Sequence, residues 1–367
     1  MKKQLPIDTS FSRLPISVIT GFLGSGKTTL LNRLLQDPQL HHTAVVINEF
    51  GAVGIDHLLV RSAKEDVIVM DNGCLCCTIK GDLVLTLQEL FVKRTKMEVP
   101  EFDRVIIETT GLADPGPLIH TLMDSPILTT YFRLDNVITT VDGVYGLTEL
   151  NEHYETVKQI AVAEYLIVTK TDLVKQVEIE QLKQRLQVIN PAATLLTPET
   201  LNIAQLFSHA LYHAQNKSLN IQKWLRAEAY VTFQPPHQSA SLLEENTPLR
   251  HDQYIQSFCI EREQPLHWKT INQWFQQLTA LRGKDLLRIK GILYTVETDL
   301  PVIVQGVQHM FQPPTTLPAW PENLPRRSQI VFITRNIKKT VIEQMLEILI
   351  NSHSPVEACA AALLLLN

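Results

Sequence analysis

The sequence predicts an α/β protein in which a mostly parallel sheet carries helices on both faces, and a smaller α+β domain follows it. Three observations support this. Short β-branched runs alternate with longer amphipathic runs over the first 200 residues. These short runs are almost continuously Val and Ile, which is typical of parallel strands covered on both faces. The order of the elements then changes after about residue 250, which predicts a second domain.

The first domain is predicted to contain six buried strands. They are expected at residues 16–20, 43–47, 67–70, 104–107, 137–141 and 165–169. Helical patterns lie between them, at residues 28–35, 82–95 and 177–188. We therefore place an open α/β domain at residues 1–212.

The second half begins with a break in this pattern. Residues 213–251 contain several prolines and are predicted to form a connecting region with one strand near Ala229 to Phe233. The smaller domain is expected at residues 252–350, with strands at 254–261, 286–296, 301–309 and 329–334. One helix starts near Trp268 and a closing helix covers 338–350, and residues 351–367 form a tail.

The composition excludes several classes of protein. With 45% hydrophobic and 19% charged residues, the 367-residue chain is neither disordered nor fibrous. The net charge is −5, so no basic excess indicates a nucleic-acid partner. The longest apolar run, Ala358 to Leu366, is far shorter than the roughly 20 residues that span a bilayer. The N-terminus does not read as a signal peptide, and we expect a cytoplasmic protein without a membrane partner.

A phosphate-binding loop follows the first predicted strand. Its sequence, Gly21-Phe22-Leu23-Gly24-Ser25-Gly26-Lys27-Thr28, matches G-x-x-x-x-G-K-[ST] in full and predicts a P-loop NTPase. Backbone amides from Gly21 to Thr29 would surround the phosphates, with Gly24, Ser25 and Gly26 in the turn. Lys27 would reach the β- and γ-phosphates, and the Thr28 hydroxyl would bind Mg²⁺. A glycine-rich turn that binds nothing is disfavoured, because strand, loop and helix occur in the required order.

Two further strand ends carry candidate nucleotide contacts. Glu108 ends the fourth strand and is expected to orient Mg²⁺, directly or through water, or to position the attacking water. Gly111 would offer its amide to the γ-phosphate. Taken alone, Glu108 would be read as a solvated acid, and the phosphate loop favours the catalytic role. After the sixth strand, Thr169-Lys170-Thr171-Asp172 resembles the guanine-reading N-K-x-D loop. Asp172 would accept hydrogen bonds from guanine and Lys170 would lie along the base, which selects GTP.

A thiol cluster follows the third strand. Cys74, Cys76 and Cys77 fall within four positions. Adjacent Cα atoms are about 3.8 Å apart, below the about 4.4 Å that a disulfide needs. The three thiolates are therefore predicted to bind one soft ion such as Zn²⁺. A fourth position is open to an oxygen, a histidine or water, and Glu49, after the second strand, is a candidate ligand for this ion or for Mg²⁺, with a solvated loop acid as the alternative. The competing interpretation is that these are core cysteines, as expected for Cys259 and Cys359.

Together these segments resemble the CobW-like family of SIMIBI-class P-loop GTPases. The matching residues are Gly21 to Thr28, Asn48 to Gly51 with Asp56, Gly73 to Cys77, Glu108 to Gly111 with Ala113-Asp114-Pro115, and Thr169 to Asp172. Leu287 to Gly291 and Gln305 to His309 look like the C-terminal domain of the family. The resemblance implies a metallochaperone that uses GTP, Mg²⁺ and Zn²⁺ or Co²⁺ and delivers metal to a client metalloprotein. It also implies a nucleotide-dependent homodimer.

Two other functions compete with this hypothesis. A P-loop kinase of a small metabolite shares the phosphate loop but would prefer ATP and give the thiols no role. A non-catalytic zinc-binding adaptor would keep its metal permanently and hydrolyse no GTP. The leading prediction is a GTPase, which hydrolyses GTP to GDP and phosphate slowly and couples this reaction to metal transfer.

Overall fold

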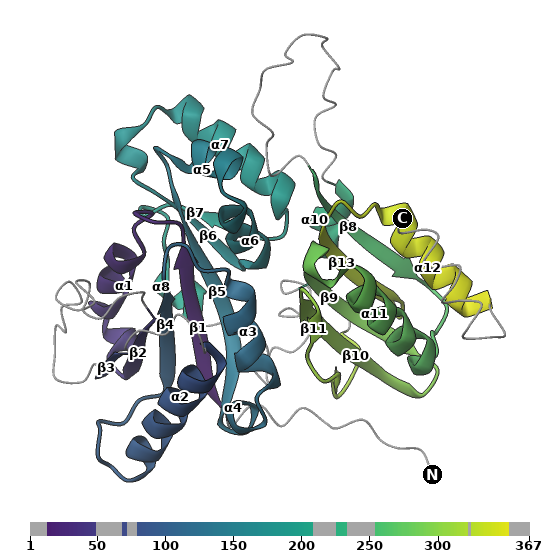
Figure 1. Cartoon of the computed structure of the whole chain (residues 1–367), viewed down its shortest axis with the longest axis horizontal. Helices are drawn as coiled ribbons and strands as arrows, with labels where there is room; N and C mark the ends of the chain where they lie inside the picture. Colours follow the sequence, from purple (N-terminus) through teal and green to yellow (C-terminus); the bar gives the residue numbers. More distant parts are fainter. Residues whose placement is uncertain are drawn as a thin grey trace.

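Two β-sheets organise the chain. The computed structural model describes residues 13–48, 68–71, 79–207, 225–232, 254–321 and 324–351. The first sheet has seven parallel strands in the order β3-β2-β4-β1-β5-β6-β7, and the second is a six-stranded antiparallel sheet in the last third of the chain. Figure 1 shows the two sheets beside each other, with the helices packed around them. The predicted fold class is thereby confirmed.

Six of the seven strands of the first sheet coincide closely with the predicted runs, although β5 begins earlier than predicted. They are β1 (Leu14–Gly21), β2 (Thr43–Asn48), β3 (Ile68–Asp71), β4 (Arg104–Thr109), β5 (Phe132–Asp142), β6 (Tyr165–Thr169) and β7 (Thr194–Leu196). The helices of this part are α1 (Lys27–Leu35), α2 (Ile79–Thr95), α3 (Pro115–Asp124), α4 (Pro126–Tyr131), α5 (Gly146–Glu152), α6 (Tyr154–Val162), α7 (Gln176–Ile189) and α8 (Ile203–Phe207). The sequence did not predict β7, the helices α3 to α6 or the short helix α8.

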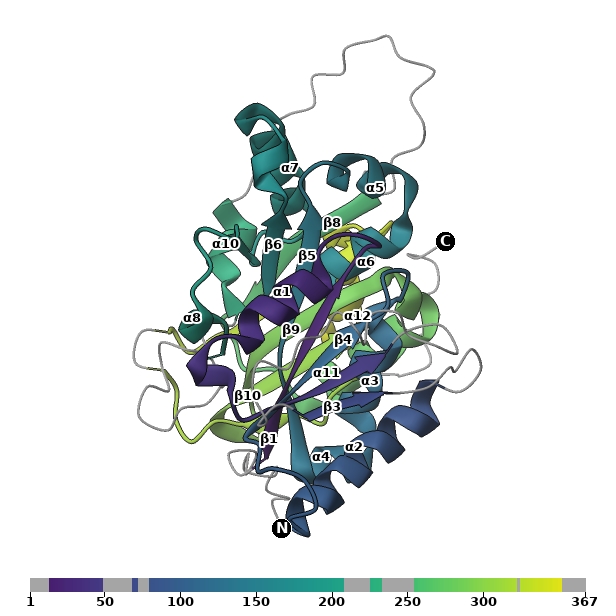
Figure 2. The same ribbon diagram turned by 90° about the vertical axis from the view of Figure 1, so that its left-hand side faces the viewer.

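Both faces of the first sheet are buried, as the continuous Val/Ile runs require. On one face, Ile16 and Val18 of β1 pack in a cluster with residues of α2 and α3. On the other face, Ile19 of the same strand packs against leucines of α1. Figure 2 looks onto the face that α1 covers. Because alternate residues of one strand enter different cores, apolar residues occur on both sides of the strand.

The second sheet has an inner and an outer face. It contains β8 (Ile255–Arg262), β9 (Leu286–Thr295), β10 (Thr298–Val307), β11 (Met310–Phe311), β12 (Thr315–Thr316) and β13 (Ser328–Arg335). The helices α11 (Trp268–Arg282) and α12 (Lys339–Asn351) cover the outer face around the fully buried Trp274. The inner face places Cys259 and Leu287 in one cluster with residues of α6 and α7. The two halves of the chain therefore share a core.

One prediction in the connecting region was wrong. The strand expected near Ala229 to Phe233 is replaced by the helix α10 (Ala227–Thr232). The β-branched Val231 and Thr232 favoured a strand, but Ala227 and Tyr230 are three positions apart and both lie buried in the shared core. Packing on one side of a helical turn has overridden the local propensity.

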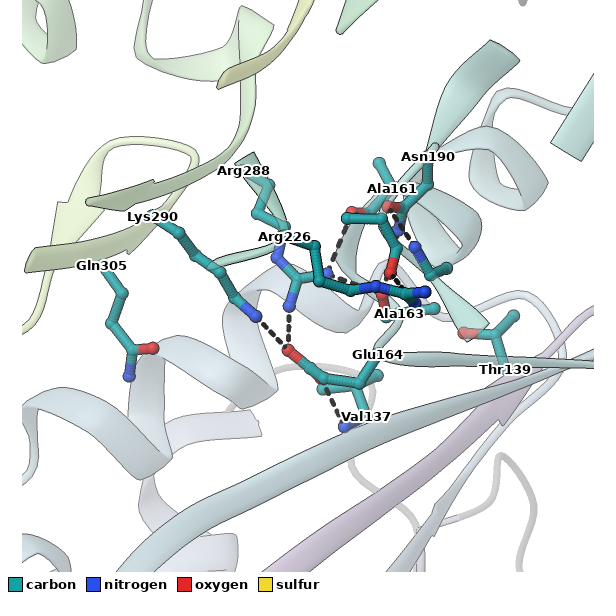
Figure 3. A network of polar contacts seen from close by, with 12 residues as sticks. Val137, Thr139, Ala161, Ala163, Glu164, Asn190, Arg226, Arg288, Lys290 and Gln305 are labelled. Atoms are coloured by element: carbon teal, nitrogen blue, oxygen red, sulfur yellow. Dashed lines mark hydrogen bonds and ion pairs between the residues drawn. The ribbon is translucent and has the colours of Figure 1, made fainter. Parts of the chain in front are cut away.

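A buried ion cluster joins the two halves (Figure 3). From β9, Arg288 and Lys290 both reach Glu164, the residue before β6. Lys290 Nζ lies 2.9 Å from Glu164 Oε1, and Arg288 also donates to the carbonyl of Ala163 at 2.6 Å. Burial lowers the pKa of Arg288 to about 9. Burial, together with the neighbouring cation Arg288, lowers the pKa of Lys290 well below the ordinary lysine value.

None of the helices in the described ranges is both long and apolar enough to cross a membrane.

Candidate functional site

The phosphate loop lies between β1 and α1, as predicted. Gly26 is the N-cap of α1 and has a φ of 91°, a left-handed conformation that a side chain disfavours. Ser25 is fully buried, and its hydroxyl donates to the carbonyl of Phe22 at 2.7 Å and lies 2.7 Å from Thr140 Oγ1 of β5. The loop is thus attached to the neighbouring strand and leads into the N-terminus of α1, a position that favours a bound anion.

Lys27 begins α1 and folds back onto the loop. Its Nζ donates to the carbonyls of Gly21 and Phe22, at 3.1 and 3.0 Å. These contacts hold the ammonium group over the loop that the sequence predicts to bind phosphate. The side chain also lines the cavity described below.

Thr28 and Glu108 meet across the site, although 80 positions separate them in the sequence. The Thr28 hydroxyl donates to Glu108 Oε1 at 2.7 Å, and Glu108 is only 5% exposed. A hydroxyl and a carboxylate oxygen are hard donors of the kind that Mg²⁺ prefers. This donor pair at the N-terminus of α1 therefore fits the magnesium role predicted for both residues.

Lys27, Thr28 and Glu108 line a cavity of about 320 Å³. Gly111 lines this cavity and packs so closely on the phosphate loop that a Cβ there would lie 2.6 Å from the backbone nitrogen of Leu23. The loop after β4 therefore touches the phosphate loop directly, and a larger residue at position 111 would separate them. The lining residues are Leu23, Gly24, Gly26, Lys27, Thr28, Thr29, Ile47, Glu108, Thr109, Thr110 and Gly111.

The predicted base-reading loop is attached to the phosphate loop. Thr169 Oγ1 donates to the carbonyl of Ser25 at 2.8 Å. Lys170 has a φ of 53°, and its Nζ pairs with Asp142 Oδ2 at 2.5 Å. Asp172 follows in a short 3₁₀ turn (Thr171–Leu173), where its side chain is exposed to solvent. Thr169 occupies the position of the usual Asn, and its hydroxyl supplies the link between the two loops.

Two carboxylates near this loop were not predicted. Asp142 ends β5, accepts from the amides of Val144 and Tyr145 at 2.8 and 3.2 Å, and holds Lys170. Glu149, on α5, is 7% exposed, and burial together with the nearby Asp142 raises its pKa to about 7. The strand-end rule that identified Glu108 applies equally to Asp142. No sequence signal marks Glu149.

The predicted metal ligands fall outside the described residues. This applies to Cys74, Cys76, Cys77 and Glu49, and also to Asp56. Their flanking segments are described: β3 ends at Asp71 and α2 begins at Ile79. Elsewhere in the described parts of the chain, no three His, Cys, Asp or Glu side chains gather closely enough to hold a metal ion.

The family models match both halves of the chain. Residues 15–197 match the CobW/HypB/UreG nucleotide-binding domain, and residues 255–349 match the C-terminal domain of the cobalamin synthesis protein CobW. The chain belongs to the CobW/HypB/UreG family. The resemblance inferred from the motifs is therefore confirmed, and the first sheet has the P-loop GTPase fold.

Individual relatives extend over most of the chain. The zinc chaperone YjiA of Escherichia coli is 30% identical over 87% of this chain and 93% of its own length. A zinc-regulated GTPase metalloprotein activator of Schizosaccharomyces pombe is 33% identical over 52% of this chain and 46% of its own length. The crystal structure of Zn(II)-bound YjiA GTPase from E. coli superposes with a TM-score of 0.63, at 25% identity, over 90% of this chain and 97% of that one.

Proposed function

We propose that this chain, a GTPase by family membership, is a metallochaperone that binds Zn²⁺ or a similar ion and releases it to a client protein according to its nucleotide state. The metal would be held by Cys74, Cys76 and Cys77, with Glu49 as the fourth ligand. Three thiolates and one carboxylate form a donor set that suits zinc and cobalt. The names of the relatives, zinc chaperones and a zinc-regulated GTPase, support the choice of metal.

The observation that carries the coupling is the register of the first sheet. Ile47 of β2 pairs with Asp71 on one side and with Glu108 on the other. Because neighbouring strands lie about 4.8 Å apart, Asp71 is roughly 10 Å from Glu108. Cys74 follows Asp71 by three residues. This spacing supports a metal loop close enough to the γ-phosphate side of the site to respond to it.

The second predicted metal-binding segment begins closer to β4, by one strand spacing. Asn48 pairs with Thr109 in the same register, and Glu49 comes next in the sequence. The strands β2 and β3 thus end at the edge of the sheet where Glu108 and Thr109 line the cavity, beside the loop that carries Gly111. A change in that loop on hydrolysis would therefore alter the positions of metal ligands.

The residues of the cavity would divide the hydrolysis reaction between them. Lys27 would bind the β- and γ-phosphates in place of its present backbone contacts, and the amide of Gly111 would bind the γ-phosphate. Thr28 and Glu108 would hold Mg²⁺, which neutralises phosphate charge as the bond to the leaving group breaks. Glu108 would also orient the attacking water, and Asp172 with Lys170 would select guanine.

The decisive experiment measures the zinc dissociation constant by chelator competition, with Mg²⁺ and either GDP or a non-hydrolysable GTP analogue. We expect a difference of at least tenfold between the two nucleotides, equivalent to about 1.4 kcal/mol of coupling. Cys76→Ser should abolish both tight binding and this difference.

The matched control is Cys259→Ala. Cys259 is a described thiol that is 3% exposed, and burial raises its pKa to about 12, so it is a poor metal ligand at neutral pH. The control variant should keep the zinc affinity of the wild type in both nucleotide states. Equal affinities with GDP and the GTP analogue, or an unchanged affinity in Cys76→Ser, would contradict the proposal.

The client protein, the cytoplasmic location and the nucleotide-dependent homodimer stay predictions. Dimer formation is tested by sedimentation velocity with GDP and with the GTP analogue. A nucleotide-dependent homodimer predicts a larger sedimentation coefficient with the analogue only.

A further inference from the structure

The loop that follows β4 is held at its centre by α6. Gln159 is fully buried, and its Nε2 donates to the carbonyl oxygens of Gly111 and Ala113, at 3.1 and 3.0 Å. The backbone carbonyl of Gln159 accepts a hydrogen bond from the Thr139 hydroxyl of β5 at 2.8 Å, which fixes this turn of the helix against the sheet. The backbone on both sides of Leu112 is therefore attached to a rigid element.

The same loop ends at Asp114, which is held from three directions. Asp114 is the N-cap of α3, and its Oδ1 accepts from the amide of Gly116 at 2.9 Å. Its Oδ2 accepts from Lys158 Nζ at 2.8 Å and from Gln308 Nε2 at 2.9 Å. Gln308 belongs to the second sheet, in the turn between β10 and β11. An ionised carboxylate only accepts, so the amide of Gln308 must present its NH₂ group here.

The position of Gln308 is constrained on all sides. Its backbone has a φ of 56°, which is unusual for a residue other than glycine. Its backbone N–H donates to the carbonyl of Leu286 at 2.7 Å. The side chain lies so close to Gly116 that a Cβ there would be 2.8 Å from Gln308 Nε2. A strained backbone and a close approach both direct this one donor at Asp114.

We propose that Gln308 is a positioning residue for GTP hydrolysis, and that it acts through Asp114 on the loop that presents Gly111 to the γ-phosphate. The inference rests on the proposed role of Gly111. Only two residues separate Gly111 from Asp114, so the position of the carboxylate constrains the path of the loop from Gln159 to the phosphate contact. The C-terminal domain thereby contributes to the geometry of a reaction that takes place in the other half of the chain.

The test compares Gln308→Asn with the wild type in steady-state GTP hydrolysis. Asn tolerates a positive φ and keeps an amide, so the turn is preserved. It withdraws the donor by one methylene, about 1.5 Å, and so breaks the contact with Asp114. We expect kcat to fall at least fivefold while KM for GTP stays within twofold, because the phosphate loop and the base loop are untouched. Asp114→Asn is measured alone and in combination with Gln308→Asn. The kcat of the double variant should be no lower than that of Asp114→Asn alone.

The matched control is Gln312→Ala. Gln312 lies just after β11, and its side chain accepts from Gln305 and makes no described contact with Asp114, so its loss should leave kcat unchanged. A merely structural role for Gln308 predicts a lower melting temperature with kcat within twofold of the wild type, and this result would overturn the inference. An increase in kcat would overturn it as well. If the wild-type chain hydrolyses no GTP, the proposed function fails. If the wild type hydrolyses GTP and the kcat of Gln308→Asn equals that of the wild type, only the positioning role is refuted.

Discussion

Replacing Glu164 with glutamine leaves two buried cations without their carboxylate. The side chains of Arg288 and Lys290 are each 8% exposed, and that of Glu164 is 24% exposed. In the wild type, Glu164 Oε2 accepts a hydrogen bond from the backbone N–H of Val137 at 2.8 Å. Glutamine has nearly the same size, and its oxygen can accept this hydrogen bond. The substitution therefore removes the charge and turns an amide NH₂ group, which can only donate, toward the two cations in place of the oxygen that accepts from them.

The expected cost follows from what remains after each change. Removing one partner of a buried ion pair typically costs 3–5 kcal/mol, and we expect about 3 kcal/mol for Glu164→Gln because the carboxylate is partly exposed. Lys290→Met instead leaves Arg288 paired with Glu164 and relieves the desolvation of one ammonium group. We expect it to cost less than about 1 kcal/mol.

Urea-induced unfolding, followed by tryptophan fluorescence, measures both free energies. The buried Trp274 reports on the C-terminal half, to which Arg288 and Lys290 belong. Glu180→Gln is the surface control: Glu180 is 52% exposed and pairs with Lys183, so it should cost less than about 0.5 kcal/mol. If Lys290→Met cost as much as Glu164→Gln, or if Glu164→Gln cost under 1 kcal/mol, the charge-balance reasoning would be refuted.

Two further predictions concern the nucleotide site. The pKa of Glu149, raised by burial to about 7 from 4.5, makes the wild type lose stability as the pH rises from 4.5 through 7, because the folded state binds the extra proton. Glu149→Gln should therefore be as stable as the wild type near pH 4 and more stable by up to about 3 kcal/mol above pH 8. Urea unfolding of both proteins at each pH measures this difference. Parallel pH profiles of the two free energies of unfolding would contradict the prediction. Asp172→Asn should weaken GTP binding at least tenfold, about 1.4 kcal/mol, and leave ATP binding unchanged in calorimetric titrations, because an amide donor would face the donors of guanine; an equal loss for both nucleotides would exclude base reading.

The strand ends of the first sheet could be predicted because burial on both faces leaves a clear pattern. Each Val/Ile run marks a strand, and the carboxyl ends of parallel strands meet at one edge, so Thr28 and Glu108 were expected to come together. The helix α3 was missed although Asp114-Pro115 is a recognisable start signal, an N-cap residue followed by proline at the first helical position. The short β7 has only three residues, too few for any period to be visible.

The contacts between the halves could not be predicted. Arg288 and Lys290 lie two positions apart on β9, and alternating charges on a strand normally indicate a solvated face. Their carboxylate partner lies 124 and 126 positions away, respectively, so only the tertiary structure shows that the charges are buried and paired. Gln308 is hidden for the same reason, since 194 positions separate it from Asp114.

These two contacts involve different parts of one short helix, α6. Lys158 and Gln159, in the middle of α6, hold the loop that follows β4, whereas the carbonyl of Ala163, just after the end of α6, accepts from Arg288. Attachment at two points predicts separable effects. Glu164→Gln should weaken the shared core and lower the free energy of unfolding, whereas Gln308→Asn should lower turnover with little loss of stability. If the C-terminal domain only stabilised the fold, the contact of Gln308 with the loop that follows β4 would affect stability and leave turnover unchanged.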